Sequence, residues 1–199
     1  DGPLAGRLLA SRVFAAGTEA ANSIDLGRNL LRVVEAEFAF RVSGALPSRG
    51  SAHGAYTVDE VMAAVGSLHL AIEIPDSRMT DFVRVGAPSL IADLACASCW
   101  VAGDAVTVDW RSVDLAAHPV TAYKNGAVAA EGMGSNVLGD PRIALTWLAN
   151  ELCVYGDGLL AGDYVTTGTC VVPVPCAPRD AFVMDFGGLG TVAMGFPLA

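Results

Sequence analysis

The chain has 199 residues, of which 53% are hydrophobic, and its mean hydropathy of +0.47 is high for a water-soluble protein. No run of about 18 apolar residues occurs, which argues against a membrane span. The net charge is −9, and the twelve basic residues, all arginines except Lys124, form no cluster, which argues against a nucleic-acid partner.

The length suits one domain with a full hydrophobic core, so we treat residues 1–199 as a single domain. The surplus of apolar residues predicts a buried subunit interface and therefore a homo-oligomer. The chain opens at Asp1 without a methionine or a targeting pattern, so we expect a fragment or a processed piece of a longer protein.

The five cysteines are an odd number without a secretory signal, which predicts a reducing, cytoplasmic location. Cys96 and Cys99 form a C-x-x-C pair, which is compatible with a redox or a zinc site. Cys170 and Cys176 have the wrong spacing for a zinc knuckle, and no histidine is near either pair in the sequence. We therefore favour buried structural thiols over a metal or redox site.

The first half of the chain mixes uncertain and clear segments. Residues 4–16 are apolar with mixed periodicity and fit a strand or a helix equally, and residues 17–30 read as loop or edge structure. Residues 31–42 alternate between two faces, which predicts a strand. Residues 46–56 are rich in Gly, Ser and Pro and predict a mobile loop.

A helix is predicted to begin after Thr57, because Glu60 three residues later completes a capping box. This helix is expected to run to about Ser67. Residues 69–74 predict a strand, and the apolar residues 90–102 are expected to be buried.

The second half of the chain carries strong local signals. Asn125 and Gly126 lie between two alternating runs and predict a hairpin. Asp140 followed by Pro141 predicts the start of a second helix, which Gly156 or Gly158 ends. The expected apolar face of this helix consists of Ile143, Ala144, Trp147, Leu148 and Leu152.

Three short strands are predicted in the tail, at residues 164–169, 181–186 and 191–196. Residues 186–190 (FGGLG) are glycine-rich but have strands on both sides, so they predict a hairpin turn rather than a phosphate-binding loop. The whole pattern indicates a β-rich α+β fold with two substantial helices. It contains no internal repeat, and its irregular order of elements argues against a doubly wound sheet.

Two glutamates, Glu35 and Glu37, lie within the apolar strand RVVEAEFAFRV. Alternate residues of a strand face the same way, so both side chains share one face. The opposite face is expected to enter the core and consists of Val34, Ala36, Phe38, Phe40 and Val42. One interpretation is a solvated outer face, with Arg32 or Arg41 as ionic partners.

A third carboxylate, Glu73, is the only charge within the apolar strand 69–74. A buried lone carboxylate is costly and needs a partner or a cation. Three carboxylates from two strands suit Mg²⁺ or Mn²⁺, whereas zinc prefers His or Cys. Asp76 and Asp81 lie on either side of Arg78, and we favour a local pairing with that arginine.

Several segments resemble the 2-keto-4-pentenoate hydratases and 4-oxalocrotonate decarboxylases of the fumarylacetoacetate hydrolase superfamily. They are VEAEFAFRVSGALP, LHLAIEIPDSR, GMGSNVLGDPRIALTWLANEL, LLAGDYVTTGT and DFGGLGTVAMGF. The resemblance implies the β-rich fold of that superfamily's C-terminal domain, with mixed sheets rolled around a metal site and a few flanking helices. It also implies that Glu35, Glu37 and Glu73 hold Mg²⁺ or Mn²⁺.

The implied activity is hydration of a small 2-hydroxy-2,4-dienoic acid, a 2-oxo acid tautomer, in aromatic meta-cleavage catabolism. The alternatives are a 4-oxalocrotonate-type decarboxylase, or a catalytically impaired partner subunit in a hetero-complex with a related enzyme. Thr169 corresponds to a position near the substrate carboxylate, although a hydroxyl bonded to backbone is equally compatible. His53 fits a solvated loop histidine better than a residue closing over the site, and His69 fits a structural one.

The sequence also departs from the family pattern. The family's active-site lysine belongs to a region upstream of Asp1, and Lys124, in a turn, cannot replace it. An acid of some hydratases corresponds to Leu4, and the usual D-N-A-S segment has Leu94 in place of asparagine. The glycines of the family's glycine-rich loop are retained, and backbone geometry is enough to explain them: they are Gly132, Gly134 and Gly139.

Overall fold

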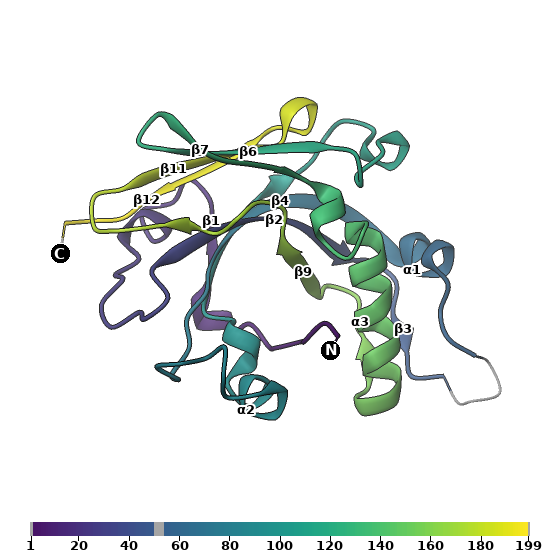
Figure 1. Ribbon diagram of the computed structural model, residues 1–199. Helices are drawn as coiled ribbons and strands as arrows, with labels where there is room; N and C mark the ends of the chain where they lie inside the picture. The colour runs from purple at the N-terminus through teal and green to yellow at the C-terminus, as the bar shows by residue number, and fades with distance from the viewer. Residues whose placement is uncertain (1, 50–53, 199) are drawn as a thin grey trace.

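The alternating segment predicted as a strand forms β2, which pairs with three other strands at the centre of the fold. The structure, a computed structural model, describes residues 2–49 and 54–198. Its six-stranded mixed sheet has the order β1-β5-β4-β2-β10, with β9 also paired to β2 (Figure 1). β1 and β5 run parallel, and the other pairs are antiparallel. The strands are β1 (Val13–Ala15), β2 (Val33–Val42), β4 (Val65–Ile74), β5 (Cys99–Ala105), β9 (Tyr164–Thr169) and β10 (Val174–Pro175).

A four-stranded antiparallel sheet of order β12-β11-β6-β7 lies over one face of the first sheet (Figure 1). Its strands are β6 (Pro119–Lys124), β7 (Ala127–Met133), β11 (Ala181–Asp185) and β12 (Thr191–Gly195). The core fills the space between the two layers. Phe38 of β2 and Phe186 after β11 meet edge to face there, with ring centroids 4.9 Å apart.

The helices lie beside and below the six-stranded sheet (Figure 1). They are α1 (Val58–Ala64), α2 (Ala87–Ala92) and α3 (Pro141–Tyr155). A two-stranded sheet joins β3 (Leu46–Pro47) to β8 (Gly158–Leu159), and single 3₁₀ turns occupy Ala10–Arg12, Ala21–Ser23, Leu94–Cys96, Trp110–Ser112, Gly134–Asn136 and Gly187–Leu189. No helix within residues 2–49 and 54–198 is long and apolar enough to span a bilayer.

The capping signals predicted the starts of α1 and α3 correctly. Thr57 and Glu60 form the predicted reciprocal capping box, and the Asp140 carboxylate accepts the Arg142 N–H at 2.7 Å. The end of α1 was predicted wrongly, because the chain turns into β4 at Val65 and pairs there with Val42. The strand predicted over 69–74 therefore starts four residues earlier than expected.

The predicted apolar face of α3 is only partly correct. Ile143 is 47% exposed, whereas Leu145 and Ala149 are fully buried against the sheet. The hairpin at Asn125-Gly126 is confirmed, and φ values of 52° and 81° at these two residues match a primed turn. The glycine-rich segment 186–190 connects β11 to β12, as predicted.

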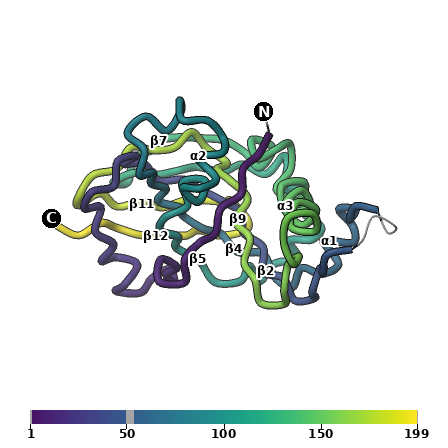
Figure 2. Tube along the Cα trace, turned by 90° about the horizontal axis from the view of Figure 1, so that it is seen from below, coloured from purple at the N-terminus to yellow at the C-terminus, as the bar shows by residue number. Residues whose placement is uncertain are grey.

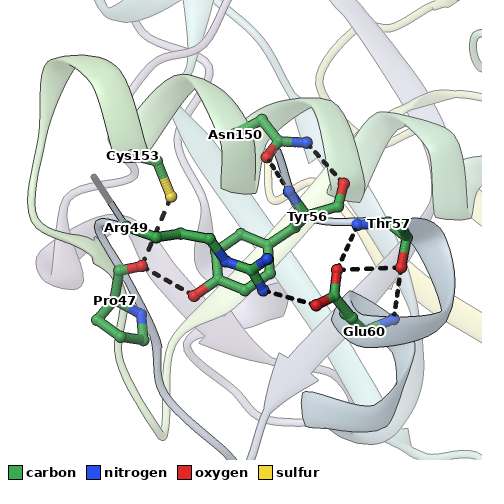
Figure 3. A network of polar contacts seen from close by, with 7 residues as sticks. All are labelled: Pro47, Arg49, Tyr56, Thr57, Glu60, Asn150 and Cys153. Atoms are coloured by element: carbon green, nitrogen blue, oxygen red, sulfur yellow. Dashed lines mark hydrogen bonds and ion pairs between the residues drawn. The ribbon is translucent and has the colours of Figure 1, made fainter. Parts of the chain in front are cut away.

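A polar network fixes α3 beside β3 and the start of α1 (Figure 3). Asn150 of α3 accepts the backbone N–H of Tyr56 at 2.7 Å and donates to its carbonyl at 3.0 Å. The Tyr56 hydroxyl donates to the carbonyl of Pro47 at 2.9 Å. The Arg49 guanidinium lies 3.3 Å from the Tyr56 ring centroid and pairs with Glu60 at 2.9 Å. These contacts hold the helix that forms one wall of the cavity described below.

Other segments differ from the expectations. Residues 4–16, which fitted a strand or a helix, contain a 3₁₀ turn and the short strand β1. The segment 90–102 is buried only at Asp93 and at residues 99–101 of β5, and Ile91 of α2 is 52% exposed. The loop predicted over 46–56 contains the short strand β3, and His53 lies outside the described residues.

Candidate metal centre

Strand register brings the three glutamates together. Glu35 of β2 lies directly opposite Glu73 of β4, and Glu37 follows two residues along the same face. One carboxylate oxygen from each lies within 4.8 Å of the others. The predicted core face of β2 is confirmed, since Val34, Ala36, Phe38, Phe40 and Val42 are all buried.

The interpretation of a solvated outer face is wrong for this cluster. Glu37 is 1% exposed, Glu73 is 9% exposed, and Glu35 is half-buried. Arg32 donates instead to backbone carbonyls of residues 27 and 29, and the Arg41 guanidinium lies 5.6 Å from the Tyr164 ring centroid. Within the described ranges, no basic side chain forms an ion pair with any of the three carboxylates.

Burial makes all three carboxylates hard to ionise, and repulsion adds to it at Glu37 and Glu73. Burial raises the pKa of Glu35 from its ordinary 4.5 to about 7. Burial, followed by the charge of Glu35, raises the pKa of Glu73 to about 8. Burial, followed by the charges of Glu73 and Glu35, raises the pKa of Glu37 well above its usual range. A cation bound among the three carboxylates would lower each of these pKa values and stabilise the ionised forms.

The donor set fits a hard divalent cation. Three carboxylates supply oxygen ligands only, which suits Mg²⁺, Mn²⁺ or Ca²⁺ and leaves coordination positions for water and substrate. Thr166 of β9 donates its hydroxyl to the Glu37 carboxylate and so fixes its orientation. Among the described residues, this is the one group of three or more acidic, cysteine or histidine side chains with such convergence.

A cavity of about 460 Å³ opens over the carboxylates. Its floor is the sheet β4-β2-β9, and one wall is α3 with the turn before it. The opposite wall is built from the N-terminal segment 3–8 and the segment 94–97. Figure 2 shows the N-terminal segment crossing below the sheet between α2 and β9. Leu4 and Leu94, the two departures from the family pattern, both line this cavity.

Thr169 lines the cavity, but its hydroxyl already donates to the carbonyl of Val171 at 2.8 Å. The neighbouring Thr167 donates to the carbonyl of Phe38 at 2.8 Å. The structure therefore shows the second of the two roles considered for Thr169, a hydroxyl bonded to the backbone. Its contact with a substrate carboxylate stays a prediction.

The wall segment after α2 adopts an unusual backbone. Leu94, Ala95 and Cys96 have positive φ values of 57°, 51° and 67°, a left-handed turn without glycine. A Cβ atom on Gly6 would lie 1.7 Å from the Leu94 carbonyl oxygen, so only glycine fits where the two wall segments meet. Such turns cluster at functional sites, and the sequence carries no local signal for this one.

Asp93 anchors that turn. Its buried carboxylate accepts the Ser77 hydroxyl at 2.6 Å, the Arg78 N–H at 2.9 Å and the Arg78 guanidinium. The predicted pairing of Arg78 with Asp76 or Asp81 is therefore wrong. Asp81 pairs with Arg84 at 3.5 Å and Asp76 accepts the Leu30 N–H at 2.7 Å, while Arg78 reaches Asp93, fifteen residues along the chain.

The remaining candidates have structural roles. His69 is buried between the Ser67 hydroxyl and the Gly103 carbonyl, both at 2.9 Å, as expected for a structural histidine. Cβ atoms on Gly132 and Gly134 would lie 2.1 Å and 1.9 Å from backbone oxygens, so close packing explains both glycines. All five cysteines are free thiols. Three are buried (Cys99, Cys170 and Cys176), and two are half-buried (Cys96 and Cys153).

Comparison with known proteins shows the family of the chain. A 2-keto-4-pentenoate hydratase of Burkholderia vietnamiensis is 30% identical over 196 residues, which cover 98% of this chain and 71% of the relative. The chain belongs to the 2-keto-4-pentenoate hydratase and 4-oxalocrotonate decarboxylase family. A 2-hydroxyhexa-2,4-dienoate hydratase of Comamonas testosteroni is 36% identical over 162 residues, 81% of this chain and 59% of the relative. No protein-family model matches the chain.

Decarboxylases of the family are similar as well. A 4-oxalocrotonate decarboxylase of Pseudomonas putida is 31% identical over 173 residues, 87% of this chain and 63% of the relative. The chain thus spans about 60% of the length of these first relatives.

Solved structures confirm the predicted fold. The 4-oxalocrotonate decarboxylase from Pseudomonas putida G7, complexed with magnesium and adipate, matches with a TM-score of 0.82 at 29% identity, over 96% of this chain and 68% of that one. A fumarylpyruvate hydrolase from Pseudomonas aeruginosa, in complex with Mn²⁺ and pyruvate, matches with a TM-score of 0.65 over 94% of this chain and 74% of that one. Its 14% identity shows the shared fold alone.

Proposed function

We propose that this protein is a divalent-metal-dependent hydratase that adds water to a 2-hydroxy-2,4-dienoic acid and yields a 4-hydroxy-2-oxo acid. The observation that carries the proposal is the buried trio Glu35, Glu37 and Glu73, which forms the cavity floor without a basic partner in the described ranges. Relatives named hydratases, at 36% and 30% identity, support the choice of reaction.

The metal assignment is Mg²⁺ or Mn²⁺, held by the three glutamates. When bound, such an ion acts as a Lewis acid that stabilises negative charge on the 2-oxygen of the substrate. Thr166 keeps the Glu37 carboxylate oriented toward the shared ligand position. The apolar walls, including Leu4, Leu94 and Trp147, exclude water from the rest of the substrate.

The reaction also needs a proton donor and acceptor. The lining residues within the described ranges include Tyr164 but no lysine, arginine or histidine. Following the resemblance, we propose that the family lysine, which it places upstream of Asp1, takes part in proton transfer. Thr169 stays our candidate for the substrate carboxylate, on condition that its hydroxyl turns away from Val171 on binding.

A decarboxylase is the second candidate, because the solved 4-oxalocrotonate decarboxylase matches with a TM-score of 0.82. Metal binding by the three glutamates would serve both reactions, since each needs an electron sink at the 2-oxygen of the substrate. Homo-oligomeric assembly, or assembly with a related active subunit, stays a prediction from composition and from the altered motif at Leu94.

The test follows the absorbance of 2-hydroxypenta-2,4-dienoate with Mg²⁺, with EDTA, and in the variant Glu35→Ala. We expect turnover with Mg²⁺ and loss of at least a hundredfold in EDTA and in Glu35→Ala, because the electron sink is removed. Glu131→Ala, an exposed glutamate on β7, is the matched control and should keep full turnover. Turnover that survives both EDTA and Glu35→Ala contradicts the proposal.

A further inference from the structure

A serine and a histidine on β4 form a hydrogen-bonded pair away from the metal centre. Ser67 and His69 lie two residues apart on the strand, so their side chains share the sheet face that carries the glutamates. The Ser67 Oγ lies 2.9 Å from His69 Nε2. We propose that Ser67 is a nucleophile activated by His69, and that it gives the protein a metal-independent acyl-transfer activity toward small carboxylic esters.

The bonds that anchor His69 also fix where its proton lies. Nδ1 lies 2.9 Å from the Gly103 carbonyl oxygen, which can only accept a hydrogen bond. In the neutral ring Nδ1 therefore carries the proton, and Nε2 is the acceptor for the Ser67 hydroxyl. This is the protonation pattern that a general base needs beside a nucleophilic hydroxyl.

Packing holds the imidazole in this orientation. His69 is 6% exposed, and the Tyr164 ring meets it edge to face with ring centroids 5.1 Å apart. Tyr164 also lines the metal cavity, so this one side chain contacts both sites. A base that is already fixed beside its nucleophile needs no rearrangement before it accepts the proton.

A groove of about 480 Å³ gives a substrate access to the serine. The half-buried Ser67 lines this groove together with Arg41, Ser43 and Gly66. Gly66 has no pairing partner on β2 and forms a β-bulge, a feature that is frequent next to active sites. A Cβ atom on Gly66 would lie 2.8 Å from the Ser43 side chain, so glycine keeps this part of the groove open.

Arg41 supplies positive charge beside the serine. It lies directly opposite Ser67 in the register of β2 and β4, and it lines the same groove. Its guanidinium lies 5.6 Å from the Tyr164 ring centroid, a contact that holds it over this face of the sheet. A guanidinium in this place stabilises the negative oxygen of a tetrahedral intermediate formed on Ser67.

In the proposed reaction, Ser67 Oγ attacks the carbonyl carbon of the ester, and the hydroxyl proton passes to His69 Nε2. The tetrahedral intermediate then collapses: the bond to the alcohol breaks, the alcohol leaves with that proton, and the acyl group stays on Ser67. Water hydrolyses the acyl group and releases the carboxylic acid. The Gly103 carbonyl is neutral and stabilises an imidazolium less than the carboxylate of a catalytic triad does, so we expect slow turnover and an acyl group that persists.

The test incubates the full chain with p-nitrophenyl acetate in EDTA, follows the release of p-nitrophenol and locates the acetyl group by peptide mass spectrometry. We expect acetylation of Ser67 and a burst of about one p-nitrophenol per chain, because the acyl group forms faster than it is hydrolysed. Acetylation of other residues without Ser67, or no acetylation in EDTA, overturns the proposal.

Two variants separate activation by His69 from mere exposure of a serine. His69→Asn keeps a side-chain donor for the Gly103 carbonyl but removes the base, and it should slow acetylation of Ser67 at least about a hundredfold. Ser43→Ala is the matched control and should leave that rate unchanged, because Ser43 lines the same groove but donates to the Ala64 carbonyl at 3.2 Å. Equal rates in the wild type and His69→Asn overturn the proposal. Should His69→Asn fail to fold, the wild-type ratio of acetylation at Ser67 and Ser43 decides, and equal labelling of the two overturns it.

Discussion

Asp93, behind one wall of the cavity, and the three glutamates on its floor are buried carboxylates with opposite surroundings. Asp93 has three donors from Ser77 and Arg78, and the Ser77 hydroxyl followed by that arginine lowers its pKa below the usual range. Burial raises the pKa of Glu35, Glu37 and Glu73, the charge of Glu35 raises the pKa of the other two further, and their described surroundings supply no cation. The same chemical group is therefore stabilised at one site and destabilised at the other.

We interpret Asp93 as a structural carboxylate and the three glutamates as candidate metal ligands. Asp93 completes its own contacts and fixes a left-handed turn in the cavity wall. The glutamates leave a deficit of positive charge at the floor of the same cavity, which an ion from solution would fill. Removing a carboxylate should thus have opposite effects on stability at the two sites.

The largest effect is expected at the partnered site. Asp93→Ala should lower the free energy of unfolding by about 3 kcal/mol, because the buried Ser77 hydroxyl and Arg78 lose their acceptor. Urea unfolding at pH 7 measures the change. Asp81→Ala, which removes an exposed ion pair, is the control and should cost less than about 0.5 kcal/mol. If Asp93→Ala lowered the free energy of unfolding by less than about 1 kcal/mol, the proposed difference between Asp93 and the glutamates would be contradicted.

A smaller change in the free energy of unfolding, of opposite sign, is expected at the glutamate cluster. In EDTA at pH 8, Glu37→Gln should raise the free energy of unfolding by about 2 kcal/mol, because it removes a buried carboxyl group that must either take up a proton on folding or carry a charge without a cation beside it. The amide oxygen can still accept the Thr166 hydroxyl, so the packing is kept. With Mg²⁺ added, the wild type should overtake the variant. Destabilisation of the metal-free variant would contradict the expected sign.

A third effect concerns the pH dependence of stability. Glu35 and Glu73 have folded pKa values of about 7 and about 8, above the ordinary 4.5. The unfolded chain therefore releases these protons first, and stability falls as pH rises from about 4.5 to 8. The Tm of the metal-free protein should drop by several degrees across this range. Mg²⁺ should raise the Tm more at pH 8 than at pH 5.5, because protons compete with the ion.

Differential scanning calorimetry in EDTA and in Mg²⁺ measures this dependence. Glu35→Gln should flatten the slope of the metal-free protein, since it removes one of the titrating groups. A Tm that rises between pH 5 and pH 8 without metal would show that the carboxylates are not destabilised by burial.

The sequence predicted those parts of the molecule that depend on local signals. The alternation of residues 33–42, the Thr57 capping box, the Asn125-Gly126 turn and the Asp140 cap each set an element by nearby contacts. The carboxylate trio was also predictable, because glutamates within apolar strands are a chemical anomaly that strand alternation converts into a common face.

Other features depend on contacts between distant residues. α1 ends at Ala64 because pairing with β2 draws Val65 into β4, and this pairing has no local signature. The bond between Arg78 and Asp93 crosses a loop and a helix, so nearer acids seemed the natural partners. The turn at Leu94–Cys96 has positive φ values without glycine, which only the surrounding packing can impose.

The central claim is that Glu35, Glu37 and Glu73 form one divalent-cation site. Titration with Mn²⁺ followed by electron paramagnetic resonance tests it most directly, because free and bound Mn²⁺ give different signals. We predict one Mn²⁺ per chain, an affinity weakened at least a hundredfold in Glu37→Gln, and an unchanged stoichiometry in Asp93→Asn. Absence of bound Mn²⁺ in the wild type, or equal binding by Glu37→Gln, would contradict the claim.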